Sequence, residues 1–114
     1  MMMSTSRARL KRNNFLLKKL CRTKNKTKIK NILQEGGKDL TNCICECALN
    51  LIKGNVPLTP YQFSRLKKHK RTLRVLSDKR VSKKKKKYTV NQKGAGLFPL
   101  IFTPIIKALA GSIL

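Results

Sequence analysis

Four cysteines and one histidine are the side chains best able to bind a metal ion or act as nucleophiles. Cys43, Cys45 and Cys47 are spaced two residues apart, so they cannot all point one way on a helix. Cys21 and His69 lie far from them in the sequence, whereas a zinc site needs ligands that converge. The first residues also lack the apolar run of a secretory signal, which favours a reduced intracellular protein with apolar thiols. We therefore predict no metal and no cofactor.

Acid–base and nucleophilic catalysis are poorly supported by this sequence. Four acidic residues stand against 28 Lys and Arg, and neither a Ser/His/Asp pattern nor a pair of carboxylates is visible. The glycine clusters Gly36-Gly37 and Gly94-Ala95-Gly96 lack the strand-to-helix setting of a phosphate-binding loop. We predict that the protein is not an enzyme.

The abundant basic side chains are suited to a different chemistry, the neutralisation of phosphate. The net charge is +24, and a polyanion would relieve the repulsion within a compact state. Lysine supplies the necessary point charges, so we expect nucleic acid as the partner and anionic lipid as the second choice. Aromatic residues make up 5% of the chain and tryptophan is absent, which favours recognition of the phosphate backbone over base stacking.

The densest basic segment is residues 65–93, with fourteen Lys and Arg and one acid, Asp78. A run of charge is ordinarily a solvated, disordered surface, but here a second unopposed basic zone covers residues 7–30. The Lys83–Lys87 run also resembles a nuclear localisation signal. The predicted phosphate contacts are Arg65, Lys67, Lys68, Arg71, Arg74, Lys79, Arg80, Lys83, Lys84, Lys85, Lys86 and Lys87.

The elements that position these side chains are predicted to be helices. Apolar residues recur at three- and four-residue steps over 40–52, with Asp39 as N-cap and Gly54 as a left-handed residue after the helix. Cys45 falls on the opposite side and is expected to be exposed. Two further helices are expected upstream, one around 10–21 and a shorter one over 26–34.

A second amphipathic helix has an explicit start. Thr59, Pro60 and Gln62 predict a capping box with proline at the first helical position. The pattern continues to about Asp78, with an apolar stripe and a broad basic surface, and Ser82 is placed to cap a further basic turn.

Together these patterns predict an all-α protein, a small bundle of three or four helices with a basic segment and an apolar C-terminal tail. The expected divisions are a basic N-terminal arm or helix (1–25), a small helical domain (26–80), a lysine-rich linker (81–95) and the apolar tail (96–114). The core is expected to be thin and marginally stable without a partner. Its predicted members are Leu17, Leu20, Ile29, Ile32, Leu33, Leu40, Ile44, Cys47, Leu51, Leu58, Phe63, Leu66 and Leu73.

The tail is joined to the basic segment at Gly94-Ala95-Gly96, which reads as a hinge. Pro99, Pro104 and Lys107 weaken the case for a transmembrane span. Three uses remain open: a helix that folds back on the bundle, an interfacial membrane segment, or a peptide that plugs a groove on another protein. The predicted membrane or capsid contacts are Leu97, Phe98, Leu100, Ile101, Phe102, Ile105 and Ile106.

The order of motifs resembles that of a known viral family. Cys45-Glu46-Cys47-Ala48 is followed by Lys53-Gly54-Asn55-Val56-Pro57-Leu58-Thr59, by Lys79-Arg80-Val81-Ser82-Lys83-Lys84-Lys85, and by Gln92-Lys93-Gly94 before the apolar tail. Over about residues 38–114 this resembles the small basic protein of Polinton/Maverick elements and adintoviruses, which is compared with the adenovirus core protein X (mu).

The resemblance implies a virion core protein that binds and condenses double-stranded DNA, found in the virion and the host nucleus. It also gives the glycine cluster a second meaning. Gln92-Lys93-Gly94-Ala95-Gly96 is similar to sites cut by adenovirus-type maturation proteases, which places a cut between Ala95 and Gly96. Capsid protein or membrane is then the expected partner of the tail.

Two other functions stay open at this point. A membrane-active peptide precursor would use the basic part only as a carrier directed to anionic lipid. A ribosome-associated protein would account for the lysine content but not for the apolar end.

Overall fold

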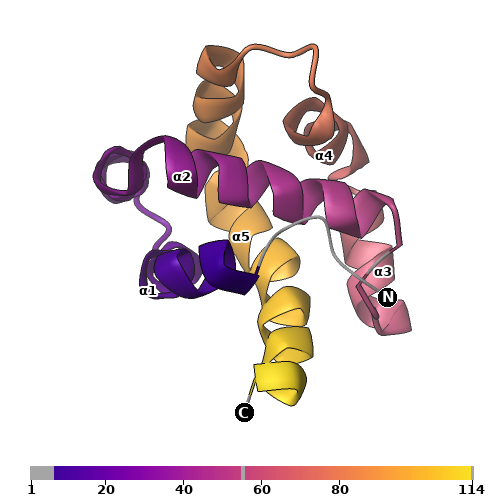
Figure 1. Cartoon of the computed structure of the whole chain (residues 1–114). Helices are drawn as coiled ribbons and strands as arrows, with labels where there is room; N and C mark the ends of the chain where they lie inside the picture. The colour runs from indigo at the N-terminus through magenta and orange to yellow at the C-terminus, as the bar shows by residue number, and fades with distance from the viewer. Residues whose placement is uncertain (1–6, 55, 114) are drawn as a thin grey trace.

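The computed structural model describes the backbone of residues 7–54 and 56–113 and the side chains of residues 8–54, 56–94, 97–99, 101 and 102. Within that part of the chain the protein is all-helical, as predicted, and contains no strand. The helices are α1 (Arg7–Arg22), α2 (Lys26–Ile52), α3 (Pro60–Lys67), α4 (Lys70–Ser77) and α5 (Lys83–Ile113) (Figure 1).

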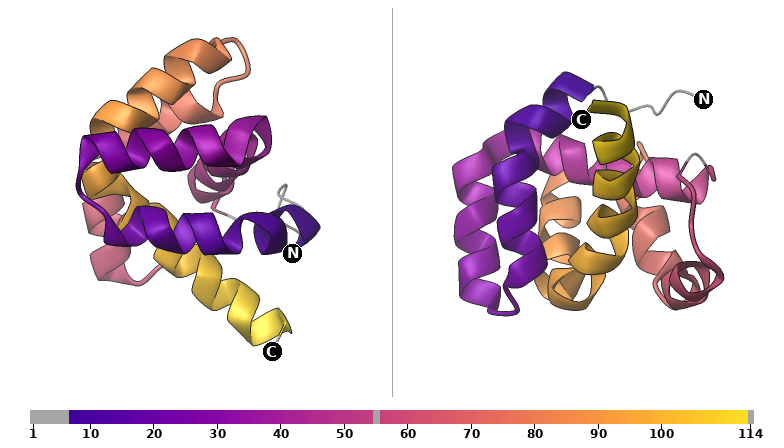
Figure 2. Two further views of the ribbon diagram at one scale, coloured as in Figure 1. Left: turned by 90° about the vertical axis from the view of Figure 1, so that its left-hand side faces the viewer. Right: turned by 90° about the horizontal axis from the view of Figure 1, so that it is seen from below.

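Helices α2 and α5 form the centre of the molecule, and the other helices flank them. Both α1 and α4 pack against α2 and α5, and α3 contacts α5. Figures 1 and 2 show α1 on one side of the central pair and α3 and α4 on the other. The described helices therefore form one body of 32 × 28 × 27 Å in which α5 is a central member.

Helix α2 consists of two helical segments that meet at a kink. Gly37 has φ 61° and ψ −153°, a region of backbone conformation essentially restricted to glycine. The predicted separation of a helix over 26–34 from one over 40–52 corresponds to this kink, but the second segment follows at once without a loop. Asp39, predicted to cap this segment, directs its carboxylate to α1, where Arg12 and Asn13 donate to it.

The chain after α2 begins as predicted and then departs from the prediction. Gly54 has φ 75°, and the Thr59–Gln62 capping box opens α3. The single helix predicted to run to Asp78 is wrong, because α3 ends at Lys67 and α4 begins at Lys70. At the break the N–H groups of Lys68 and His69 donate to the carbonyls of Arg65 and Leu66, three residues back, so the last turn of α3 tightens instead of continuing as α-helix.

Helix α5 replaces both the predicted linker and the predicted hinge. It begins at Lys83, after Ser82 accepts a hydrogen bond from the backbone N–H of Lys85 at 3.2 Å, and continues to Ile113. The cap at Ser82 is thus confirmed, while the linker over 81–95 and the hinge at Gly94-Ala95-Gly96 are wrong. The backbone is helical through all three hinge residues.

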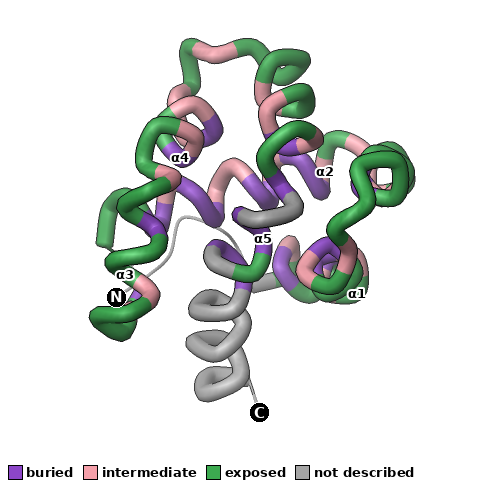
Figure 3. Tube along the Cα trace, turned by 180° about the vertical axis from the view of Figure 1, so that it is seen from behind, coloured by how far each residue is buried: buried purple, intermediate pink, exposed green. Residues whose placement is uncertain are grey.

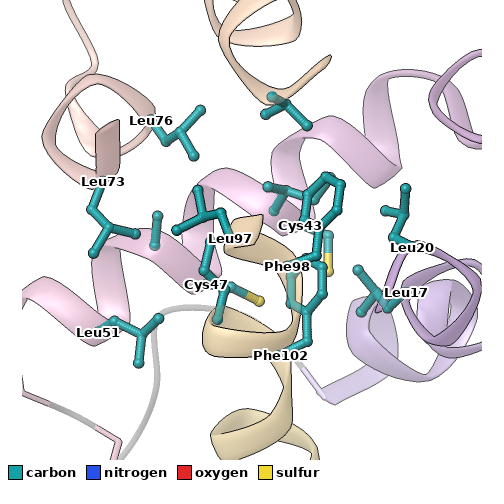
Figure 4. Packing of buried hydrophobic residues seen from close by; sticks show 14 of the residues in the cluster. Leu17, Leu20, Cys43, Cys47, Leu51, Leu73, Leu76, Leu97, Phe98 and Phe102 are labelled. Atoms are coloured by element: carbon teal, nitrogen blue, oxygen red, sulfur yellow. The ribbon is translucent and has the colours of Figure 1, made fainter. Parts of the chain in front are cut away.

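The core lies where α1, α2, α4 and α5 meet, and the first half of the predicted tail forms its middle (Figure 4). The Phe98 and Phe102 rings are fully buried and stacked, with centroids 5.4 Å apart. Most predicted core residues are buried, but Ile32 and Leu58 are half-buried and Phe63 is 55% exposed. The thin-core prediction fails because it omitted Leu10, Cys43, Ala48, Val56, Leu76, Val90, Leu97, Phe98, Ile101 and Phe102.

The burial of Leu97, Phe98, Ile101 and Phe102 corrects the prediction that they contact a membrane or capsid protein. Such a contact needs exposed side chains, whereas these fill the space between the other helices. Three uses were left open for the tail. The buried side chains among residues 97–102 fit the first of them, a helix that folds back on the bundle. The side chains of Leu100, Ile105 and Ile106 lie outside the described residues.

Candidate nucleic-acid interface

The predicted phosphate contacts lie on three consecutive parts of the chain. They occupy α3 and its C-terminal turn, α4, and the stretch from Lys79 through the first turns of α5. All are exposed except Lys86, which is half-buried. Figure 3 shows this exposure along the outer sides of α3, α4 and the start of α5. We call these twelve residues the α3–α5 basic surface.

In α4 the pattern of the sequence explains the orientation of the basic side chains. Leu73 and Leu76 are buried against the core, which leaves Arg71 and Arg74 on the outer face. Lys70 is exposed on the same face and extends the basic surface beyond the predicted set.

The start of α5 concentrates positive charge at a helix terminus. Its first turns carry Lys83–Lys87 and its first turn has no acidic residue. The positive end of the helix dipole adds to the charge of these ammonium groups, an unfavourable arrangement for the free protein. Phosphate placed here would be attracted by both the side chains and the helix terminus.

Two of the acidic residues, Asp39 and Glu46, form ion pairs with arginines of α1 and not with the α3–α5 basic surface. Asp39 pairs with Arg9 and Arg12, each at 3.1 Å, and Glu46 also pairs with Arg9. Hydrogen bonds from Arg12 and Asn13 lower the pKa of Asp39 to about 2. These contacts join α1 to α2 and leave the α3–α5 basic surface without those carboxylates.

Arg80 differs from its neighbours on the α3–α5 basic surface. Its guanidinium donates twice to the carboxylate of Asp78 at 3.1 Å, and its backbone N–H donates to the same side chain at 2.9 Å. These hydrogen bonds lower the pKa of Asp78. Arg80 therefore stabilises the turn before α5, and among the described residues it is the member of the surface that pairs with a carboxylate.

His69 lies between α3 and α4, and the charge of Lys93 in the middle of α5 acts on it. Burial lowers the pKa of the half-buried His69, and the charges of Arg65, Lys68 and Lys93 lower it further. Lys93 is exposed, so it adds a cation in the middle of α5 to those at the start of the helix. Lys93 is absent from the predicted phosphate contacts, although it belongs to the basic segment 65–93.

Aromatic rings are more prominent on the surface than the composition predicted. Phe15, Tyr61, Phe63 and Tyr88 are each more than half exposed. Cations lie over three of these rings, at 4.7 Å for Lys19 on Phe15, 5.6 Å for Arg65 on Tyr61 and 5.5 Å for Lys67 on Phe63. Each pair is four residues apart on a helix, and this spacing was visible in the sequence.

The cysteines belong to the interior and its edge. Cys43 and Cys47 are buried, and Cys21 and Cys45 are half-buried, so the prediction of an exposed Cys45 is wrong. Burial raises the pKa of the Cys21 and Cys45 thiols, and a hydrogen bond with Cys43 raises the pKa of Cys47. Thiols with raised pKa values are weak nucleophiles and poor metal ligands. In the described residues no group of three or more His, Cys, Asp or Glu could hold a metal ion.

Comparisons of the chain with protein-family models, with curated proteins and with solved structures find no match. Among the helices of the described residues, none combines the length and apolar character needed to cross a membrane.

Proposed function

We propose that this protein is a virion core protein that binds and condenses double-stranded DNA without reading its sequence. The observation that carries the proposal is the α3–α5 basic surface, whose cations are exposed except for Lys86. Among the described residues, Asp78 is the carboxylate that forms an ion pair with it, through Arg80. The resemblance to the small basic protein of Polinton/Maverick elements and adintoviruses supports the same role in the virion and host nucleus.

The chemistry of the surface favours phosphate over base edges. Its charge comes from flexible lysines and from arginines spread over several elements, and such cations neutralise a backbone without fixing a base register. Each neutralised phosphate releases condensed counterions, so log affinity falls with log salt by about 0.9 per contact on duplex DNA.

The test is a titration of two duplexes of unrelated sequence with the full chain at several salt concentrations. Fluorescence anisotropy of the duplex measures binding. We expect equal affinities for the two duplexes and a steep salt dependence. A variant with Lys83–Lys87 changed to Gln should lose up to about 4.5 from the log–log slope, since five contacts are removed. The matched variant with the same lysines changed to Arg should keep the slope. Weak or salt-insensitive binding by the wild-type chain would overturn the proposal.

The proposal extends to capsid attachment and to cleavage by a maturation protease between Ala95 and Gly96. Both need the C-terminal half of α5 to leave the bundle, since Leu97 and Phe98 are buried next to the cut. The masses of this protein's fragments in purified particles test the extension. A species that ends at Ala95 supports cleavage, and the intact chain alone argues against it.

The alternative, a membrane-active peptide precursor, faces the same requirement. Its apolar side chains Phe98, Ile101 and Phe102 would have to leave the core before they could enter a bilayer. Leakage of anionic vesicles by the full chain at micromolar concentration would favour this function over the core-protein role.

A further inference from the structure

A second basic surface surrounds the turn between α1 and α2. Lys19, Arg22, Lys24 and Lys28 line an open hollow of about 580 Å³. All four are exposed, and none forms an ion pair within the described residues. Glu35 is the acidic residue on the rim, so one carboxylate faces four cations. We call these four cations the α1–α2 turn surface.

Local hydrogen bonds fix the backbone that presents these cations. The Asn25 side chain accepts from the N–H groups of Thr27 and Lys28 at 2.8 and 3.1 Å, which caps α2. The Asn25 N–H donates to the hydroxyl of Thr23 at 3.3 Å. Because the turn is held this way, its charges are positioned before any ligand arrives, and binding them costs less conformational entropy.

The α1–α2 turn surface and the α3 and α4 part of the α3–α5 basic surface lie on opposite sides of the molecule. The α5 part lies between them, since Lys30 of α2 and Lys87 of α5 line one hollow. Helix α1 packs on α2 and α5 from one side, and α3 and α4 lie on the other. Figure 1 and the right-hand view of Figure 2 both place the α1–α2 turn and α3 at opposite ends of the body, whose longest dimension is 32 Å. A straight duplex that lies along α3 and α4 therefore leaves the α1–α2 turn surface facing solvent.

We infer that a single chain is bivalent, and that its α1–α2 turn surface binds a second DNA segment while the α3 and α4 part of the α3–α5 basic surface holds the first. The inference rests on the proposed function and adds a mechanism, condensation by bridging. The occupant is a phosphate backbone because four exposed cations gather around the hollow against one carboxylate, that of Glu35, on its rim.

The experiment measures bridging and single-duplex binding on the same full-length proteins. One duplex is biotinylated and immobilised, and a second carries a fluorophore. The amount of fluorescent duplex that the protein retains on the immobilised duplex, called capture, reports bridging. Anisotropy with the fluorescent duplex alone reports single binding. Sedimentation of the chain on a short duplex establishes that one chain, and not a dimer, occupies each complex.

Three variants of equal net charge separate bridging from simple charge neutralisation. The turn variant carries Lys19→Gln, Arg22→Gln, Lys24→Gln and Lys28→Gln. The matched variant carries Lys67→Gln, Lys68→Gln, Arg71→Gln and Arg74→Gln. A split variant carries Lys24→Gln, Lys28→Gln, Lys67→Gln and Arg71→Gln, so each surface keeps some of its cations. All replaced side chains are exposed, and circular dichroism checks that each variant folds.

We expect the turn variant to lose at least tenfold in capture while its single-duplex affinity changes less than threefold. The split variant should keep most of the capture. Equal capture by the turn and split variants would overturn the inference in favour of neutralisation alone. Persistent capture by a turn variant that no longer binds a polyglutamate probe would overturn it in favour of an acidic protein partner. Wild-type chain that fails to bind the single duplex would instead refute the proposed function.

The double variant Lys24→Gln, Lys28→Gln guards against a folding defect in the turn variant. It should lose capture in part, with an unchanged melting temperature. Bridging would also be overturned if both this double variant and the turn variant captured as much duplex as the wild-type chain.

Discussion

At the residue scale, Gly94 is the position that links the middle of α5 to the core. Side chains in a helix lean toward its N-terminus, so the ring of Phe98 covers the residue one turn earlier. Residue 94 is buried, and a Cβ there would lie 2.4 Å from Cε2 of Phe98. Gly94 therefore provides room for a buried ring, and its place in a glycine-rich stretch had suggested a hinge instead.

Replacing Gly94 with Ala tests this packing. Helix propensity alone would favour alanine by about 1 kcal/mol. Overpacking against the buried Phe98 ring typically costs about 1–3 kcal/mol, so we expect the free energy of unfolding to fall in urea denaturation. In the background of Phe98→Leu the added methyl group should be tolerated or stabilising. An increase in stability from Gly94→Ala in the wild-type chain would show that the ring does not occupy this space.

The Asp39 carboxylate predicts a specific dependence of stability on acid. Its pKa is lowered to about 2 in the folded protein, by Arg12 first and then by Asn13. A lowered pKa contributes stability above the unfolded value, near 3.9, and that contribution is lost as the pH falls toward 2. The melting temperature should therefore drop over this window, and less steeply for Asp39→Asn. Identical profiles for the two proteins would contradict the role of this carboxylate.

Some of these residue-level features can be read directly from the sequence, and others cannot. The Thr59–Gln62 capping box and the left-handed Gly54 follow from local backbone chemistry, and both are confirmed. The role of Gly94 depends on a ring that is buried by helices from elsewhere in the chain. Local pattern contains no information about that contact.

At the scale of the elements, α5 combines two segments that sequence analysis treated as separate. Gly94, Gly96 and Pro99 all weaken helix formation. The burial of Phe98 and Phe102 between α1 and α2 more than offsets those preferences. The predicted amphipathic segments are helical because each carries an apolar stripe, although the second is divided into α3 and α4. The fold of α5 depends on its neighbours instead.

Removal of the segment after Ala95 should abolish the fold. The truncated chain 1–95 lacks Phe98 and Phe102, and loss of one buried Phe side chain typically costs about 3–5 kcal/mol against a total stability of about 5–15 kcal/mol. We expect weak helical circular dichroism and no cooperative urea transition. Addition of a synthetic 96–114 peptide should restore part of the helical signal. A cooperative transition of chain 1–95 alone would show that the core does not require α5.

At the scale of the whole molecule, the dominant quantity is a net charge of +24 in a body 32 Å long. The screening length is about 30 Å at 0.01 M salt and about 8 Å at 0.15 M. At low salt each cation is therefore repelled by most of the others, and the two basic surfaces destabilise each other across the core. The charge could be read from the sequence, whereas its distribution over the helices of the bundle required the fold.

Salt should therefore stabilise the free protein. Between 0.01 and 0.15 M NaCl we expect the melting temperature to rise by roughly 4–8 °C, the shift that corresponds to about 1 kcal/mol in a domain of this size. Differential scanning fluorimetry measures the change. The variant with Lys83–Lys87 changed to Gln should show a smaller rise. A melting temperature independent of salt would mean that repulsion contributes little to the stability of this fold.

The helix α5 carries Lys83–Lys87 at one end and Phe98 and Phe102 in the core. Under the proposed function the same helix binds DNA and completes the core, which makes duplex DNA a folding ligand. A ligand that binds the folded state alone adds about 2.7 kcal/mol of stability when its free concentration is 100 times its dissociation constant. The amount of folded protein would thus follow the local concentration of genome, and core mutations that weaken the fold would appear experimentally as losses of DNA affinity.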